Sequence, residues 1–475
     1  MSTLTWATSS AVLVSTRDYT MLRMTQPDPS QDSTPKFAVA TRGRPFRWLR
    51  DYLEAPLGST LTEQHNFHYA FREAALIGVI NAASTFLPVF MARLGGSNIQ
   101  ISLITTLPSL AGVALAIPLG LFMQTRRNII PWYAYGRIGG QAAFGAAALA
   151  SLMMPPDLVI PAILAIYGVA MIFATATNVA FNVVMDATAG TRGRFELMSR
   201  RWSLMGFMTA VTLAVAGDML NRLPFPLNYQ LVFCAFSVAG LWAYQYGSRI
   251  RVPDHPSAAR GVLGDSVRAR TAAMAARVRI ERPFLAFEMR RFVSAISVTF
   301  IMPLIPLYYV RVLDASDRWI GFIGTTQSLM LLVGYAIWRR QSHRRGAAFV
   351  LVVAMFGYAL YPVALASTQY VAVAALLAGL GAVFSSGMNL AIFDRLMSTV
   401  PAGYGVTFNS IDTTVVYTAG VVAPIAAAVL ADRVGIGGAL LAGGAIGLLS
   451  AVLFATERTP RVVQKSASAA EGTSV

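Results

Sequence analysis

The side chains most able to do chemistry in this sequence are the few ionisable residues that lie inside long apolar segments. Asp412 occupies the first turns of one such segment. A charge at membrane depth is costly unless it is paired or hydrated, so an embedded carboxylate is a candidate functional group. Asp412 could take up a proton, or it could pair with an arginine of segment 124–127 or 192–201. We favour the second interpretation, in which the ion pair holds one end of a helix bundle closed.

A second embedded charge is Arg137, about two turns inside its apolar segment. It could contact a bound solute, or it could form a structural ion pair with Glu73 or Asp186. We expect Glu73 and Glu288 to lie near the ends of their segments and to pair with neighbouring arginines.

Enzymatic chemistry has little support in the sequence. The four histidines, His65, His68, His255 and His343, all lie outside the apolar segments. The spacing of His65 and His68 could hold a metal ion, but histidines at a membrane interface are the simpler interpretation. We find no phosphate-binding loop and no nucleophile motif. The sequence therefore predicts no enzyme, no metal and no cofactor.

The apolar segments are the elements that must position these residues. The chain is 55% hydrophobic and 13% charged, about half the charged fraction of a soluble domain. Each segment has the length of a helix that crosses the hydrocarbon layer. We therefore predict an all-α polytopic membrane protein. Its twelve predicted spans are 70–92, 99–123, 129–153, 158–184, 203–220, 228–247, 287–310, 319–338, 347–366, 371–393, 407–430 and 436–456.

Lysine and arginine are concentrated in alternate loops, which predicts the orientation. The poor side holds only Arg93, Arg222, Arg311, Arg318 and Arg433. Positive residues stay on the cytoplasmic side, so both termini are predicted to be cytoplasmic in an inner (cell) membrane. The net charge of +16 is thereby explained by contact with membrane lipid, and no nucleic acid partner is expected.

An internal repeat divides the chain into two halves. Residues 94–110 match residues 313–329, and Asn178 and Ser199 recur as Asn389 and Ser410. Six spans in each half insert both halves in the same direction, so they are related by an axis along the membrane normal. The predicted organisation is a largely disordered cytoplasmic tail (1–69), a six-helix half (70–247), a basic cytoplasmic linker (248–286), a second six-helix half (287–456) and a cytoplasmic tail (457–475).

With these features the chain resembles the major facilitator superfamily over residues 70–456. The family's loop after the second span reads Gly-x-x-x-Asp-Arg-x-Gly-Arg-Arg. Here Gly120, Arg126 and Arg127 match it, whereas Gln124 stands in place of the acid. Pro424 and the run from Leu430 to Gly435 are also similar to the family. The resemblance implies a gating role for Arg126 and Arg127. Together with Asp412, Arg137 and Glu73 they are the candidate coupling or gating residues.

In the family, the first and fourth helices of each half line a central cavity. On that basis the polar residues of the first, fourth, seventh and tenth spans are predicted to contact a solute. Each could instead bond only a neighbouring helix. The predicted substrate-binding residues are Asn81, Thr85, Asn178, Asn182, Ser297, Ser386 and Asn389.

Two functions are compatible with these features. The first is a secondary transporter of a small organic molecule, a proton-coupled monomer that works by alternating access between its halves. The second is a membrane protein with a transporter fold that acts as an assembly factor, a delivery factor or a sensor without transport. Nothing in the sequence names the substrate or the direction of movement.

Overall fold

The computed structural model describes residues 60–124, 126, 128–252, 280–399 and 405–456, which belong to one unit of the chain, Leu49–Val475. These residues form helices joined by short turns, and no strand occurs among them. Most of the predicted N-terminal tail, residues 253–279 of the predicted linker, and the predicted C-terminal tail lie outside the described residues.

The first half of the chain forms the helices α2 (Leu61–Arg93), α3 (Asn98–Gln124), α4 (Ile130–Met153), α5 (Pro156–Arg222) and α6 (Leu227–Gly247). Helix α2 begins nine residues before the predicted first span, at a capping box made by Thr60 and Glu63. Helix α5 contains two membrane-length segments, Pro156–Phe181 and Arg200–Arg222. The backbone between them is helical, where the sequence indicated a basic loop.

The second half forms α8 (Arg282–Ile301), α9 (Leu304–Arg311), α10 (Asp317–Arg345), α11 (Ala347–Ala366), α12 (Val371–Thr399) and α13 (Gly405–Ala455). Helices α8 and α9 together make one membrane-length segment, Arg282–Arg311. Helix α13 is interrupted at Gly435, whose φ of 80° is a left-handed conformation that favours glycine. The interruption separates the predicted eleventh and twelfth spans.

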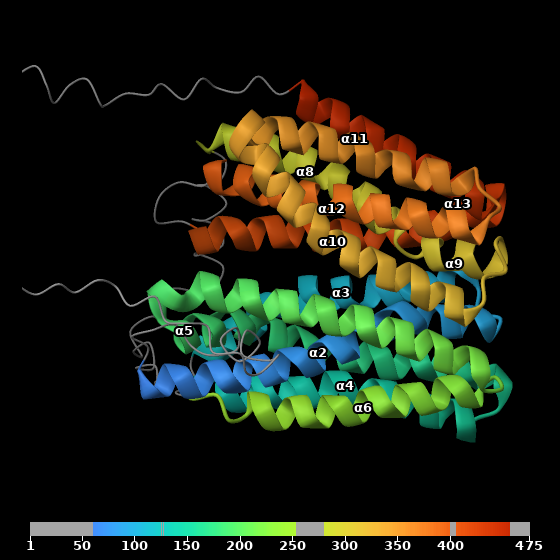
Figure 1. The fold of residues 1–475 in the computed structure, drawn as a ribbon, viewed down its shortest axis with the longest axis horizontal. Helices are drawn as coiled ribbons and strands as arrows, with labels where there is room; N and C mark the ends of the chain where they lie inside the picture. The colour runs from blue at the N-terminus through green and yellow to red at the C-terminus, as the bar shows by residue number, and fades with distance from the viewer. Residues whose placement is uncertain (1–59, 125, 127, 253–279, 400–404, 457–475) are drawn as a thin grey trace, which may run out of the picture. The chain divides into compact units, whose positions relative to one another are not determined.

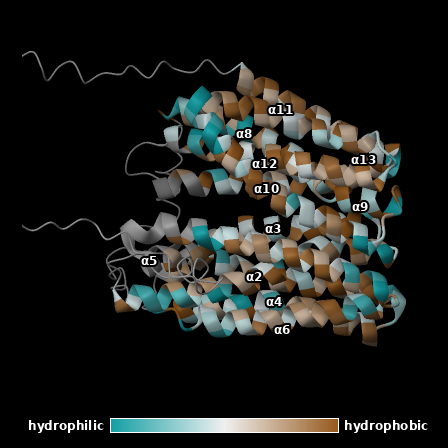
Figure 2. Cartoon of the chain, viewed as in Figure 1, coloured by the Kyte–Doolittle hydropathy of each residue, from teal (hydrophilic) through white to brown (hydrophobic). Residues whose placement is uncertain are grey.

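The predicted number of spans follows from these elements. Ten segments among the described residues are long and apolar enough to cross a membrane, and one of them, Ile411–Ala455, contains both arms of α13. Helix α4 is not among the ten, but it packs along α5 and α6. Counting α4 and both arms of α13 gives the twelve predicted spans. Figure 2 shows hydrophobic residues along the middles of the helices and hydrophilic residues toward their ends.

The two halves meet through equivalent helices (Figure 1). Helix α3, the second of the first half, packs against α13, and α10, the second of the second half, packs against α5. The ring of Tyr417 lies against Gly112 in the first contact, and Thr325 donates a hydrogen bond to the carbonyl oxygen of Ala210 in the second. The second helix of each half thus contacts the fifth span of the other half, as a parallel repeat requires.

The bundle has two chemically different ends. The turns 94–97, 154–155, 223–226, 312–316 and 367–370, with Gly435, lie at what we call the arginine-poor end. The opposite, arginine-rich end carries Arg126, the end of α10 at Arg345, and the start of α8 at Arg282.

Candidate functional site

Three polar side chains lie close together in the second half of α2. This helix contains the most buried of the membrane-length segments, at 61%. Asn81 and Ser84 are nevertheless exposed, and Thr85 is partly exposed. Ser84 donates a hydrogen bond to the carbonyl oxygen of Asn81 at 2.6 Å, whereas the Asn81 amide has no partner among the described residues. Because most of α2 is covered by protein, these residues mark the face that other helices leave open.

Asn178 is exposed on the inner side of α5. Val169, which is 57% exposed, marks the outer face of this segment. Nine residues are about two and a half helical turns, so Asn178 lies on the side opposite Val169. Asn178 is exposed, although it does not lie on the outward face of α5. Asn178 therefore faces away from the outer surface of the bundle.

Asn389 has the same relation to α12. Leu380 is 49% exposed on the outer face, and Asn389, nine residues later, is exposed on the opposite side. Asn178 and Asn389 are repeat equivalents, as are Val169 and Leu380. The two asparagines are thus placed alike in their halves, and neither side chain forms a hydrogen bond to another described residue.

Three other predicted contact residues have different surroundings. The Ser297 hydroxyl is buried and donates to the carbonyl oxygen of Gly443 at 3.0 Å, inside the second half. It lines a cavity of about 10 Å³, which holds one water molecule at most. Ser386 is fully buried where α12 contacts Gly334 of α10. The side chain of Asn182 lies outside the described residues.

A buried ion cluster surrounds Glu73 in the first half. Its carboxylate is fully buried and accepts hydrogen bonds from the Tyr133 hydroxyl at 2.5 Å and from Arg137 Nε at 3.1 Å. Arg201 Nη2 lies 3.7 Å from the other carboxylate oxygen and is itself 2% exposed. Arg137 thus pairs with Glu73, one of the two partners that the sequence suggested. Glu73 is buried inside the first half, and it pairs with arginines, as we expected from the sequence.

The partner of Asp412 is Arg291, which lies in the same half. Arg291 Nε donates to Asp412 Oδ1 at 3.2 Å, and both side chains are mostly buried. No described contact joins Asp412 to the predicted arginines of the first half. Arg126 is exposed and lies over the rings of Phe122 and Trp132. Arg127 lies outside the described residues.

Glu288 is a carboxylate whose importance the sequence did not reveal. It lies on α8 and is 6% exposed, and neither of its carboxylate oxygens forms a hydrogen bond to another described residue. Arg291 follows it by three residues, on the same side of the helix. Within the described ranges, Asp412 of α13 and Arg291 are the charged groups that act on it electrostatically.

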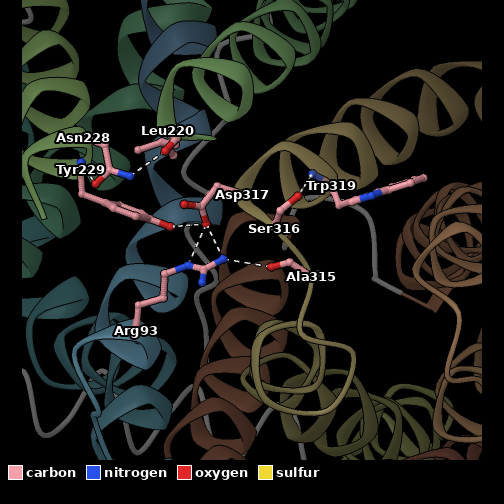
Figure 3. A network of polar contacts seen from close by, with 8 residues as sticks. All are labelled: Arg93, Leu220, Asn228, Tyr229, Ala315, Ser316, Asp317 and Trp319. Carbon is pink, nitrogen blue, oxygen red and sulfur yellow. Dashed lines mark hydrogen bonds and ion pairs between the residues drawn. The ribbon is translucent and has the colours of Figure 1, made fainter. Parts of the chain in front are cut away.

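At the arginine-poor end, a charged network joins the two halves (Figure 3). Arg93, at the end of α2, binds Asp317 at the start of α10, with Nη2 and Oδ1 2.8 Å apart. Arg93 also donates to the carbonyl oxygen of Ala315 at 2.9 Å. The fully buried Tyr229 of α6 donates its hydroxyl to the same Asp317 oxygen at 2.6 Å.

A second network repeats this contact with the halves exchanged. Arg311, at the end of α9, donates to Asn98 Oδ1 at the start of α3 at 2.6 Å, and it also donates to the carbonyl oxygen of Gly96. The Asn98 amide in turn donates to Asp432 of α13 at 2.6 Å. Asn98 and Asp317 are equivalent in the internal repeat. In each network an arginine that ends one half's first span therefore binds the residue that begins the other half's second span.

Together these contacts fasten one end of the bundle. They combine an ion pair, charge-assisted hydrogen bonds and close helix packing at Gly217 and Gly321, where a Cβ on Gly217 would lie 2.8 Å from the Gly321 Cα. The exposed polar residues of α2, α5 and α12 lie between this end and the arginine-rich end. The two networks hold the halves together at this end.

Comparisons with known proteins agree with this architecture. Residues 291–475 match the model of the Major Facilitator Superfamily, while no curated protein sequence matches the chain. A mutant of the nucleoside transporter NupG superposes with a TM-score of 0.65 and 11% identity, covering 82% of this chain and 99% of its own.

Two further solved structures have the same fold. The xylose transporter XylE from E. coli, in an inward open conformation, gives a TM-score of 0.60 at 14% identity, covering 84% of this chain and 96% of that one. A bacterial homolog of the human lysosomal transporter Spinster, inward-facing and unoccupied, gives 0.61 at 11% identity, covering 84% and 97%. Residues 291–475 thus match the Major Facilitator Superfamily, and the chain as a whole has the fold of these solved transporters.

Proposed function

We propose that this protein is a secondary transporter that moves a small, polar organic molecule across the cell membrane by alternating access. The observation that carries the proposal is the pair of repeat-related networks that fasten the arginine-poor end, centred on Arg93–Asp317 and Arg311–Asn98. Contacts between the ends of two halves are suited to forming and breaking as a unit.

The structure corresponds to the inward-facing state in this proposal. If the arginine-rich end is cytoplasmic, the fastened end is extracellular, and the polar residues are reached from the cytoplasm. Two of the structural neighbours, XylE and the Spinster homolog, are described as inward open and inward-facing.

The substrate class follows from Asn81, Asn178 and Asn389. An amide offers both hydrogen-bond donors and an acceptor and carries no charge. Exposed amides on the inner faces of α2, α5 and α12 suit a neutral molecule with several hydroxyl or amide groups. Two of the neighbours are transporters of a nucleoside and of xylose, and both compounds fit that description.

The proposed energy source is a proton gradient. Arg126 and Arg127 are proposed to take part in gating. The embedded carboxylates Glu73, Glu288 and Asp412 are candidates for proton exchange, because ionisable groups at membrane depth are costly to keep without a function. The protein would work as a monomer, since the proposed path lies between its own two halves.

Counterflow in proteoliposomes tests the transport proposal. Purified protein is reconstituted with unlabelled nucleosides or pentoses inside, and uptake of the labelled compound is followed without any gradient of protons. We expect transient accumulation of at least one compound, which protein-free liposomes should not show. Absence of exchange across the whole panel, together with a stable complex with another protein, would favour the assembly, delivery or sensor function instead.

A further inference from the structure

The surroundings of Glu288 differ from those of Glu73, which is also buried. Glu73 has two arginines and a tyrosine hydroxyl within hydrogen-bond or ion-pair distance. Glu288 is 6% exposed and forms no hydrogen bond to any residue that the structure describes. A buried polar group is normally paired, and each exception calls for a physical explanation. Burial without a hydrogen-bonded cation favours the protonated form of Glu288, because burying a neutral carboxyl group costs far less than burying an unpaired charge.

Among the described residues, Arg291 is the only cation that acts on Glu288, and it is already shared. Its Nε is bonded to Asp412 Oδ1 at 3.2 Å. Two carboxylates, one from α8 and one from α13, thus compete for one guanidinium. When Glu288 is neutral, Asp412 retains Arg291. When Glu288 is ionised, its carboxylate also attracts the Arg291 guanidinium.

We infer that Glu288 is the proton-binding residue that couples transport to the proton gradient, and that the Arg291–Asp412 ion pair is the element its ionisation rearranges. The inference rests on the proposed transport function and gives the proton a specific site. Glu288 accepts a proton from water on one side of the membrane and returns it to water on the other side, so no further reactant is needed.

The connection to the moving parts runs through α13. Asp412 is in the first arm of α13, and the same arm carries Tyr417, which packs against Gly112 of α3 in the other half. Helix α8, which carries Glu288 and Arg291, packs along α13. A change in the pairing of Asp412 therefore acts on the packing of α13 against α3, one of the two helix contacts that join the halves.

Infrared spectroscopy of the purified protein tests proton binding without any substrate. The carbonyl stretch of a protonated carboxyl group is followed while the pH is raised. We expect a band that disappears with pH in the unmodified protein and in Asp394→Asn, and that is missing in Glu288→Gln. Asp394→Asn is the matched control, because Asp394 is an exposed carboxylate at the same end of the bundle. Persistence of the titrating band in Glu288→Gln would overturn the inference.

Transport measurements separate this inference from the proposed function. The probe is a labelled nucleoside or D-xylose, whichever shows counterflow. We expect Glu288→Gln to keep counterflow and to lose proton-driven accumulation to the level of protein-free liposomes, and Glu288→Asp to restore part of it. No counterflow in the unmodified protein would contradict the transport function, whereas proton-driven accumulation by Glu288→Gln would contradict the role of Glu288 alone. If Glu288→Gln lost both activities, equal losses in Glu288→Asp would also count against the inference.

Discussion

At the scale of single residues, charge compensation distinguishes the two halves. The Glu73 cluster contains one carboxylate and two arginines, whereas the Glu288 cluster contains two carboxylates and one arginine. Arg201 and Asp412 occupy equivalent positions in the repeat with opposite charge. The first cluster is therefore suited to holding a half together, and the second to responding to a proton.

The Glu73→Gln variant tests the structural role of the first cluster. The substitution leaves Arg137 and Arg201 buried without their counter-ion, and removing one partner of a buried pair costs about 3–5 kcal/mol. We expect a clearly lower thermal unfolding temperature in detergent. Asp394→Asn, at an exposed carboxylate, should leave it unchanged. Equal unfolding temperatures for Glu73→Gln and the unmodified protein would contradict the assignment.

The paired asparagines provide a second prediction at this scale. Asn178→Ala and Asn389→Ala each remove one hydrogen-bonding amide from the proposed path, a loss of about 1.4 kcal/mol or roughly 10-fold in affinity. We expect each variant to raise the half-saturation concentration for counterflow by that factor. Asn221→Ala, at an exposed residue of the arginine-poor end, is the control. If only one of the two variants has an effect, the symmetric site is wrong.

At the scale of elements, the crossing of α5 and α10 depends on two glycines. A Cβ on Gly217 would lie 2.8 Å from the Gly321 Cα and 3.0 Å from the carbonyl oxygen of Asp317. Only glycine permits such an approach. The crossing therefore brings α10 close enough for Asp317 to reach Arg93 of the other half.

The Gly217→Val variant should separate these helices. Overpacking of this kind costs about 1–3 kcal/mol, and the contact is relieved if α5 and α10 move apart. The measurement is the distance between spin labels introduced by Met219→Cys and Trp319→Cys in a Cys234→Ser background. We expect it to increase in Gly217→Val.

Gly206→Ala is the control for this crossing. A Cβ at Gly206 would lie 3.5 Å from the nearest atom of Leu332, an ordinary contact. The spin-label distance should therefore stay unchanged in Gly206→Ala. An unchanged distance in Gly217→Val as well would show that the close approach is not maintained in solution.

At the scale of the whole molecule, the arginine-poor networks should set the balance between inward-facing and outward-facing states. Asp317→Asn removes the charge that binds Arg93, a loss of about 2 kcal/mol or roughly 30-fold in the population ratio. We expect a thiol introduced by Ser84→Cys, with Cys234→Ser, to react faster with an impermeant reagent added outside the cell.

Asp218→Asn is the matched control for this prediction. Asp218 lies 3.7 Å from Arg318 of the other half, but both side chains are exposed, and such pairs contribute about 0–1 kcal/mol. Labelling in this variant should match that of the unmodified protein. If Asp317→Asn also labels at the original rate, the network does not control access.

The number of spans, their division into two parallel halves and the fold could be predicted from the sequence. These features depend on the length of apolar segments and on the repeat, which are local properties of the chain. The sequence also identified Arg137 and Asp412 as embedded charges, because a charge inside an apolar segment is visible without a structure.

The partners of these charges were decided only by the tertiary structure. Arg201 was placed in a basic loop and is instead buried beside Glu73, and Asp412 binds Arg291 of its own half. The networks of Arg93 and Arg311 join residues more than 200 positions apart. The internal repeat indicated that the two networks are related, because it makes Asn98 and Asp317 equivalent. Side-chain pairing depends on helix rotation and on which helices cross, and no local pattern specifies either.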